Sequence, residues 1–355
     1  MIVEGAVVDV DGARPAYVRF RKGRVVEVGA PGTDSRRGRE RRIRGIVTPR
    51  PVNSHTHLGD AAASREPPRA DVAEIVGPHG LKFRLLSSLS ARDKEHDMRA
   101  ALERMVREGV GAVVDFREEG VPGAEQLRRA SQGLPIEVRI LGRPVRRPVE
   151  LGELSELLRV TQGIGVSSAR EENAVTRTLL ADRAHRAGKW FALHASEGAR
   201  EPPEAYLHPR PDLLVHLTTA TPEDLEAVAK ARIPVAVCLR SNALFGRSPD
   251  LSAFARAGVR LLIGSDNAML NGPSIFRETE FAYLSGRLFS RPVDAAYLAR
   301  AAYVEPWLWL EEPGRARVAP GMAGTPLALR LPPEDPEYQL VTRATEQLIV
   351  PTGAD

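Results

Sequence analysis

The chain of 355 residues contains a single cysteine, Cys238. One cysteine cannot form an intramolecular disulfide, and zinc sites built from pairs of thiolates are excluded. Any metal site in this chain must therefore be made from histidine and carboxylate side chains. Cys238 has no histidine beside it in the sequence and is expected to be a buried strand residue.

Long hydrophobic runs are also missing, because the chain has no stretch of about eighteen consecutive apolar residues, the length that a membrane-spanning helix needs. The N-terminal segment carries acidic residues where a signal peptide requires an unbroken apolar core. We therefore expect no membrane association and a cytoplasmic location.

The chain also lacks a large excess of one charge, because it contains 50 Lys and Arg residues and 46 Asp and Glu residues. Aromatic residues make up only 5% of the chain, and no basic stripe is interleaved with them. A nucleic-acid partner is therefore not expected. Hydrophobic residues make up 43%, enough to build a core, and the length suits one α/β barrel with an appendage.

Both ends of the chain have the pattern of β-structure. Short apolar stretches at residues 2–10, 16–20 and 25–28 are separated by the turn signals Asp11-Gly12 and Lys22-Gly23. The tail resembles them, with strand-like stretches at 326–331 and 338–341. Residues 1–44 and 318–355 are therefore predicted to pair into one small β-domain.

Residues 45–317 have a different pattern, in which apolar strand-like runs alternate with amphipathic helices such as 93–107, 171–187 and 222–231. Thr221 and Pro222 match a helix N-cap followed by proline at the first helical position. Residues 58–86 lack periodicity and are predicted to form a long loop that shapes a pocket. Eight βα units predict an α/β fold, a (β/α)8 TIM-type barrel. The predicted strands are residues 45–54, 111–116, 136–141, 164–167, 190–194, 213–216, 235–239 and 259–264.

The first barrel strand ends in His55-Thr56-His57. Side chains alternate between the two faces of a strand, so His55 and His57 point the same way and can bind one ion together. Two histidines at a strand end are weak evidence alone, because they can equally be structural.

Other strands also end in groups that suit a metal: His194, His216 and Asp266. The C-terminal strand ends of a barrel converge on one mouth, so a purely structural role for all of these residues is disfavoured. We predict that His55, His57, His194 and Asp266 bind one divalent cation, Zn²⁺ first and Fe²⁺ as the alternative.

Such a cation lowers the pKa of a bound water from about 15.7 towards about 7, which makes hydroxide available. Asp266 can accept the proton of that water. Glu197, three residues after His194, is placed to carry a proton to the leaving group, although a surface glutamate would look the same in the sequence. His216 is assigned to polarise the substrate, orient the hydroxide or bind a second metal.

In order along the chain, HTH, HASE, His216, LRSN and GSDN resemble the motifs of the amidohydrolase superfamily. They are most similar to the subgroup of cytosine, guanine and adenosylhomocysteine deaminases and triazine chlorohydrolases. The resemblance implies one Zn or Fe on His55, His57, His194 and Asp266, with Glu197, His216 and Asp266 catalytic. It also implies a β-sandwich made from both chain ends.

The sequence departs from the family at two places. Leu239 replaces the proline of the CPxSN motif, in which Ser241 and Asn242 are the predicted substrate contacts. The predicted fourth strand offers no lysine to bridge two metals, so a second metal is disfavoured. Glu171 or Glu172 could take the place of that lysine. On the loop after strand one, Lys82 and Arg84 are further substrate-binding candidates for an anionic group, with solvated loop charges as the alternative.

The predicted activity is hydrolysis of a carbon–nitrogen bond other than a peptide bond, by metal-bound hydroxide. The leading hypothesis is deamination of a small nitrogen heterocycle. Opening of a cyclic amide, as in imidazolonepropionase-like relatives, is the alternative, and halide displacement or a metal-containing binding protein without catalysis are more distant. The expected partner is a small-molecule substrate, and homo-oligomers are common among such barrels.

Overall fold

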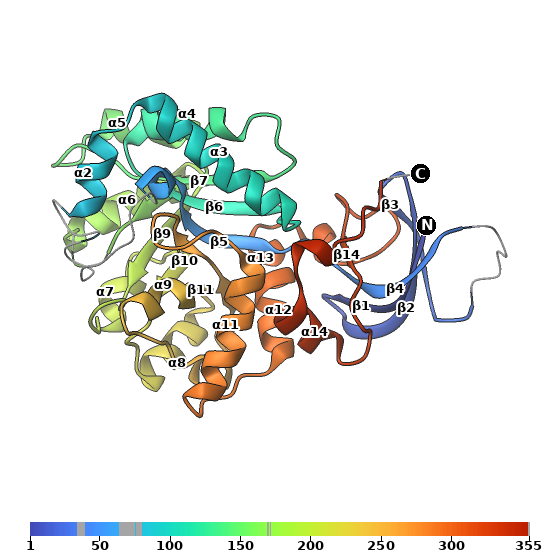
Figure 1. The fold of residues 1–355 in the computed structure, drawn as a ribbon. Coiled ribbons are helices and arrows are strands. Elements are labelled where there is room, and N and C mark those ends of the chain that lie inside the picture. The colour runs from blue at the N-terminus through green and yellow to red at the C-terminus, as the bar shows by residue number, and fades with distance from the viewer. Residues whose placement is uncertain (34–39, 64–74, 76–79, 169, 171, 354–355) are drawn as a thin grey trace. The chain divides into compact units, whose positions relative to one another are not determined.

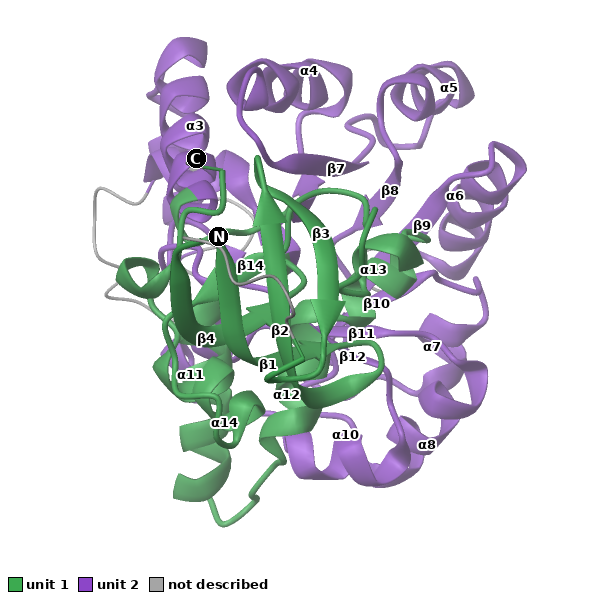
Figure 2. Ribbon diagram, turned by 90° about the vertical axis from the view of Figure 1, so that its right-hand side faces the viewer, with its two compact units in different colours: residues 1–52, 107–111, 275–355 green, residues 53–106, 112–274 purple. Residues whose placement is uncertain are grey.

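The computed structural model describes residues 1–33, 40–63, 75, 80–168, 170 and 172–353. Contacts within the chain divide it into two compact units (Figure 2). The first consists of Met1–Val52, Arg107–Gly111 and Ile275–Asp355, and the second of Asn53–Val106 and Ala112–Ser274. The predicted domain boundaries, 1–44 with 318–355 and 45–317, remain a prediction.

The first unit contains a five-stranded sheet in the order β14-β4-β1-β2-β3 (Figure 1). Its strands are β1 (Ile2–Asp9), β2 (Gly12–Arg21), β3 (Arg24–Gly29), β4 (Arg42–Thr48) and β14 (Leu327–Leu329). Strand β14 pairs antiparallel with β4, so the two ends of the chain share one sheet as predicted. In the part of the chain that the structure describes, these strands form this single sheet and not two facing sheets.

Helices complete the first unit, and one of them corrects the sequence prediction. The helices are α11 (Ile275–Leu288), α12 (Ala295–Tyr303), α13 (Glu305–Trp309), η2 (Pro313–Arg315), α14 (Pro336–Arg343) and η3 (Glu346–Leu348). The strand expected at residues 338–341 was wrong, because these residues lie in α14. Pro336 occupies the first turn of that helix, where its missing N–H costs nothing, and Leu340 and Val341 are buried.

The second unit is a sheet in the order β12-β11-β10-β9-β8-β7-β6-β5-β13. Its strands are β5 (Val52–His57), β6 (Ala112–Arg117), β7 (Glu137–Gly142), β8 (Gly163–Val166), β9 (Trp190–Ala195), β10 (Leu213–His216), β11 (Val235–Val237), β12 (Leu261–Ile263) and β13 (Asp266–Asn267). Strands β6, β8, β10, β11 and β12 are buried along their whole length, as expected where helices cover a parallel sheet.

The eighth barrel strand is split into two parts. Strand β12 pairs in parallel with β11, and β13 pairs in parallel with β5. Only Gly264 and Ser265 separate the two parts, so the segment joins both edges of the sheet and closes the predicted barrel. Glycine is required at this crossing, because a Cβ on Gly264 would lie 2.7 Å from the Cβ of His55.

The helices of the second unit are η1 (Leu58–Ala63), α2 (Leu81–Ser87), α3 (Ala91–Arg107), α4 (Gly120–Ser131), α5 (Leu151–Val160), α6 (Ala174–Arg186), α7 (Pro203–Leu207), α8 (Pro222–Ala231), α9 (Leu239–Leu244) and α10 (Leu251–Ala257). Those that Figure 2 labels, α3 to α8 and α10, lie outside the strands. The expected N-cap is confirmed, since Thr221 and Asp224 form a capping box at the start of α8.

Two further sequence predictions were wrong in detail. The single strand expected at 45–54 is two strands, β4 and β5, because Pro49 and Pro51 interrupt it and proline cannot donate to a strand ladder. The loop expected at 58–86 contains η1 and α2 in its described part. Among the described residues, no helix is long and apolar enough to span a bilayer.

Candidate metal centre

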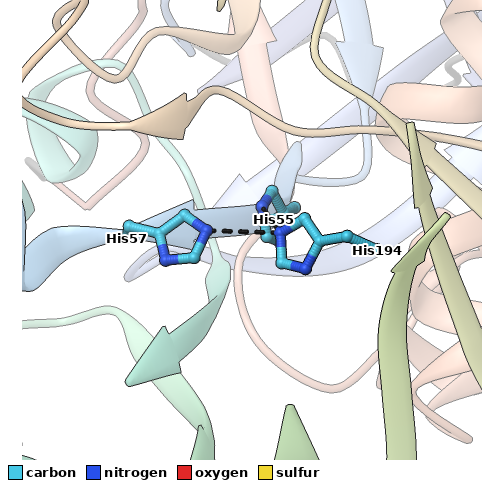
Figure 3. A group of neighbouring side chains, drawn as sticks. All are labelled: His55, His57 and His194. Carbon is cyan, nitrogen blue, oxygen red and sulfur yellow. Dashed lines mark hydrogen bonds between the residues drawn. The ribbon is translucent and has the colours of Figure 1, made fainter. Parts of the chain in front are cut away.

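Three histidines from two strands meet at one point (Figure 3). Nε2 of His194 on β9 lies 3.1 Å from Nε2 of His55 and 3.3 Å from Nε2 of His57, both on β5. His55 and His57 both face His194. They therefore lie on the same face of β5, as the alternation of side chains along a strand predicts. His55 and His194 are buried, and His57 is 14% exposed.

Asp266 joins this group from β13. Its Oδ1 lies 3.3 Å from Nε2 of His55 and 3.7 Å from Nε2 of His57. The φ angle of Asp266 is 60°, a left-handed conformation that residues other than glycine rarely adopt. The backbone thus turns sharply where β13 begins, and the carboxylate lies beside the histidines.

The donor set fits a single divalent cation. Imidazole nitrogen and carboxylate oxygen bind Zn²⁺ at about 2.0–2.2 Å, so atoms that share one ion in tetrahedral geometry lie about 3.3–3.5 Å apart. The four atoms here are close to that spacing. Nδ1 of His194 donates to the carbonyl oxygen of Val166 at 2.9 Å, which leaves Nε2 with its lone pair available to an ion.

The charges of this group also favour a cation. Burial lowers the pKa of His55 to about 4 and that of His194 well below its usual range. Burial would raise the pKa of the Asp266 carboxyl, but His55 and His216 hold it well below its usual range. Burial would also lower the pKa of His57, yet Glu118 and Asp266 raise it to about 9. Without a metal, His57 therefore carries a proton, and a cation can take the place of that proton.

His216 lies at the end of β10 and is 1% exposed. Its φ angle is 75°, again left-handed. Its Nε2 lies 3.7 Å from Oε2 of Glu197, the residue predicted to transfer protons. Together with His55 and Asp266, His216 forms a second group of ligand atoms within 4.8 Å of one another, so the structure brings all five predicted metal and catalytic side chains of the strand ends to one place.

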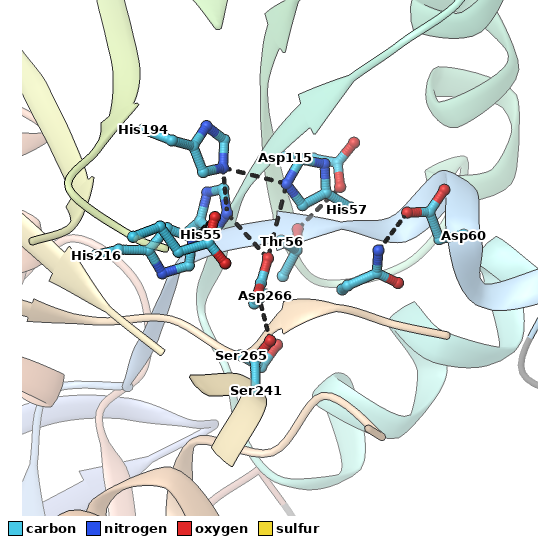
Figure 4. Close-up of polar contacts among 12 residues, drawn as sticks. His55, Thr56, His57, Asp60, Asp115, His194, His216, Ser241, Ser265 and Asp266 are labelled. Atoms are coloured by element: carbon cyan, nitrogen blue, oxygen red, sulfur yellow. Dashed lines mark hydrogen bonds and ion pairs between the residues drawn. The ribbon is translucent and has the colours of Figure 1, made fainter. Parts of the chain in front are cut away.

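The two predicted substrate contacts on α9 instead touch residues of the centre, and Figure 4 shows the first of these contacts, between Ser241 and Asp266. Ser241 donates its hydroxyl hydrogen to Oδ2 of Asp266. Nδ2 of Asn242 lies 3.4 Å from Nδ1 of His216. Both side chains are buried. In this arrangement they orient Asp266 and His216, and contact with a substrate remains a prediction.

Of the two candidates on α2, Lys82 is buried and Arg84 is exposed. Nζ of Lys82 lies 2.7 Å from Oδ2 of Asp60 and 2.8 Å from Oε1 of Glu118. Burial would lower the pKa of Lys82, but these two carboxylates raise it. The ammonium is therefore already neutralised by acidic side chains.

Of the two glutamates suggested for a second metal, the structure describes Glu172. Glu172 forms an ion pair with Arg147 and belongs to none of the metal-ligand groups found among the described residues. Glu171 lies outside the described residues.

Sequence reasoning missed Asp115, Glu118 and Asp60. Asp115 is buried on β6, where its Oδ2 accepts hydrogen bonds from Thr56 Oγ1 at 2.9 Å and from the Leu58 amide at 2.6 Å. It thus holds the backbone on both sides of His57. A charged residue inside the apolar run of β6 was the available signal.

A pocket of about 300 Å³ opens beside His194. His194 and Glu197 line it, so the predicted acid and a predicted metal ligand face the same space. The remaining lining residues are Ser168, Arg170, Ala195, Ser196, Gly198, Ala199 and Glu201.

Comparison with known proteins shows the fold and the family of this chain. A protein of Methanothermobacter thermautotrophicus named "Putative aminohydrolase" is 35% identical over 257 residues, covering 66% of this chain and 67% of that protein. The fold is similar to that of an adenosine deaminase from Xanthomonas campestris with bound zinc, at a TM-score of 0.77 and 19% identity over 99% of this chain and 91% of that one.

An atrazine chlorohydrolase from Arthrobacter aurescens complexed with zinc has a TM-score of 0.77 and 17% identity, over 99% of this chain and 94% of that one. The model of the amidohydrolase family matches residues 46–304. The predicted barrel, family and enzyme class are therefore confirmed. The chain belongs to the amidohydrolase family and is a hydrolase of carbon–nitrogen bonds.

Proposed function

We propose that this protein is a hydrolytic deaminase of a small nitrogen heterocycle and that it uses one divalent cation, zinc before iron. His55, His57, His194 and Asp266 would hold the ion, and Glu197, His216 and Asp266 would act on the substrate. The observation that carries the proposal is the position of Glu197, which lines the pocket with His194 and lies 3.7 Å from His216.

The bound cation would supply a nucleophilic water at neutral pH. Glu197 would protonate the ring nitrogen next to the carbon that bears the amine, and Asp266 would accept one proton of the water whose oxygen bonds to that carbon. His216 would stabilise the charge that develops on the groups bonded to this carbon. Asp266 would then pass its proton to the amine nitrogen, so that the carbon–nitrogen bond breaks and ammonia leaves. The remaining hydroxyl would return its proton to Glu197, and a carbonyl replaces the amine.

Two features of the site suit this chemistry. The side chain of Glu197 is 34% exposed, so it can exchange protons with solvent between turnovers. The pocket volume of about 300 Å³ is at the small end of the range for ligand sites, which favours a single small ring system. The aminohydrolase name of the archaeal relative supports the same reaction class.

The test is a substrate panel assayed with the metal-loaded protein, in which ammonia is detected. The panel contains aminated heterocycles, cyclic amides and chlorinated triazines. Ammonia release that disappears after chelation supports the proposal. Ring opening without ammonia would support the cyclic amide alternative, and retained metal without any hydrolysis would support a binding protein.

A further inference from the structure

A second group of charged side chains lies beside the proposed metal centre, on the far side of His57. We call Asp60, Lys82 and Glu118 the Lys82 cluster. Lys82 projects from α2 and is 8% exposed, with Nζ 2.7 Å from Asp60 and 2.8 Å from Glu118. Glu118 in turn lies 3.7 Å from Nδ1 of His57. His57 thus faces the centre with Nε2 and the cluster with Nδ1.

The Lys82 cluster also contacts β13, the strand that contains the proposed ligand Asp266. Nδ2 of Asn267 donates to Oδ2 of Asp60 at 2.6 Å, and Asn267 follows the proposed ligand Asp266 in β13. Oε2 of Glu118 lies 3.8 Å from Nη1 of Arg117. The two carboxylates are therefore held in place from several elements.

Without the lysine, Asp60 and Glu118 of the cluster would form a cation site together with His57. His57, Asp60 and Glu118 offer ligand atoms that lie within 4.8 Å of one another. Two of their buried atoms, Nδ1 of His57 and Oδ1 of Asp60, have no hydrogen-bond partner in the part of the chain that the structure describes. Because Nε2 of His57 would hold the first ion, Nδ1 could bind a second ion only after the ring loses its remaining proton and becomes an imidazolate. This imidazolate, with the carboxylates of Asp60 and Glu118, is a donor set that suits Zn²⁺.

The geometry points to Lys82 as the cation of this second site. Its ammonium neutralises Asp60 and Glu118, takes the space of a second metal ion and so keeps the centre mononuclear. A lysine ammonium is a compact point charge, which can replace an ion between carboxylates without bidentate geometry. This inference rests on the proposed metal centre, because the first ion must bind at His55, His57, His194 and Asp266.

The experiment counts bound metal. The full-length chain is stripped of metal, dialysed against excess Zn²⁺ and analysed for zinc per protein. The wild type is expected to bind one equivalent, and Lys82→Ala two, because the space and the negative charge become available. Lys82→Arg retains the cation and should remain at one equivalent.

Two controls make the count specific. Lys94→Ala removes a lysine that forms a similar ion pair, with Glu119 at 2.9 Å, and should leave one equivalent. Lys82→Ala combined with Asp60→Asn removes a ligand of the new site and should return the count to one. Lys82→Met, which keeps most of the buried stem, serves if the alanine variant does not fold.

The outcomes separate the two proposals. No zinc on the wild type would reject the metal centre itself. One equivalent on the wild type and still one on the folded Lys82→Ala or Lys82→Met protein would reject the role of Lys82 alone. Two equivalents on the wild type would also reject it, whether or not the variants fold.

Discussion

Ser241 donates its hydroxyl hydrogen to Oδ2 of Asp266, the carboxylate whose Oδ1 faces His55 and His57. Both residues are buried, so this hydrogen bond is shielded from water. It fixes which oxygen of Asp266 is directed to the histidines. A partner of this kind orients a metal ligand and typically changes metal affinity about 10- to 100-fold when it is removed.

Ser241→Ala should therefore weaken zinc binding by about one to two orders of magnitude, because Asp266 loses its orientation and a buried oxygen loses its donor. Competition with a chromogenic chelator measures this affinity. Ser131→Ala removes an exposed hydroxyl that donates to the Arg128 carbonyl of its own helix and is the matched control. An unchanged affinity in Ser241→Ala would show that the hydrogen bond does not position the ligand.

Glu197→Gln should lower the turnover number by about 10²- to 10⁴-fold, the usual contribution of a general acid or base. Glutamine keeps the shape of the side chain but cannot transfer a proton. Zinc content should stay at the wild-type value, because Glu197 is not a proposed ligand. Glu204→Gln, at an exposed position on α7, is the control, and full activity of Glu197→Gln would remove its assigned role.

Zinc affinity should increase with pH below about 9. In the metal-free protein the pKa of His57 is raised to about 9, so at pH 7 the ring carries a proton that zinc must displace, whereas His55, with a pKa of about 4, is already neutral. The apparent association constant should rise about tenfold per pH unit between about 6 and 8.

Calorimetric titration in two buffers of different ionisation enthalpy measures the protons released on zinc binding. We expect about one proton per zinc from His57 at pH 7, and about half a proton more from the bound water, whose pKa falls towards about 7. The share released by His57 should diminish as the pH approaches about 9. Release of no more than about half a proton per zinc at pH 7 would mean that His57 is neutral in the metal-free protein.

Thr221→Ala should lower the free energy of unfolding by about 1 kcal/mol, the typical effect of losing an N-cap side chain. Thr221 Oγ1 accepts from the Asp224 amide at 3.3 Å, and the Asp224 side chain accepts from the Thr221 amide at 3.0 Å. Urea unfolding measures the change. Zinc content should not change, since α8 supplies no ligand, and an unaltered unfolding midpoint would show that the cap is energetically neutral.

Much of the site could be predicted because it follows the order of the strands. His55 and His57 share a face through the two-residue period of a strand. His194 and His216 lie at the ends of β9 and β10, and Asp266 follows β12 after two residues, in strands whose neighbours are dictated by βα repetition. Parallel strands in a closed barrel bring those ends together whatever the intervening sequence, so local pattern was sufficient.

Other features depended on contacts that have no regular spacing. The pairing of Lys82 with Asp60 and Glu118 joins a helix, a 3-10 helix and the residue after a strand, and the hydrogen bond from Ser241 to Asp266 joins residues 25 positions apart. The helix at 336–343 was mistaken for a strand because its short apolar stretch fits either period. In these places packing against distant residues decided the structure.

The amino-acid sequence by itself therefore determined the barrel, the family and the side chains that its strand ends present, because alternation and strand order are local properties. Only the tertiary structure decided that Ser241 and Asn242 touch Asp266 and His216, and that Lys82 lies between two carboxylates next to His57. The energy of a buried charge depends on which partners lie within a few ångströms, and that distance is set by the fold.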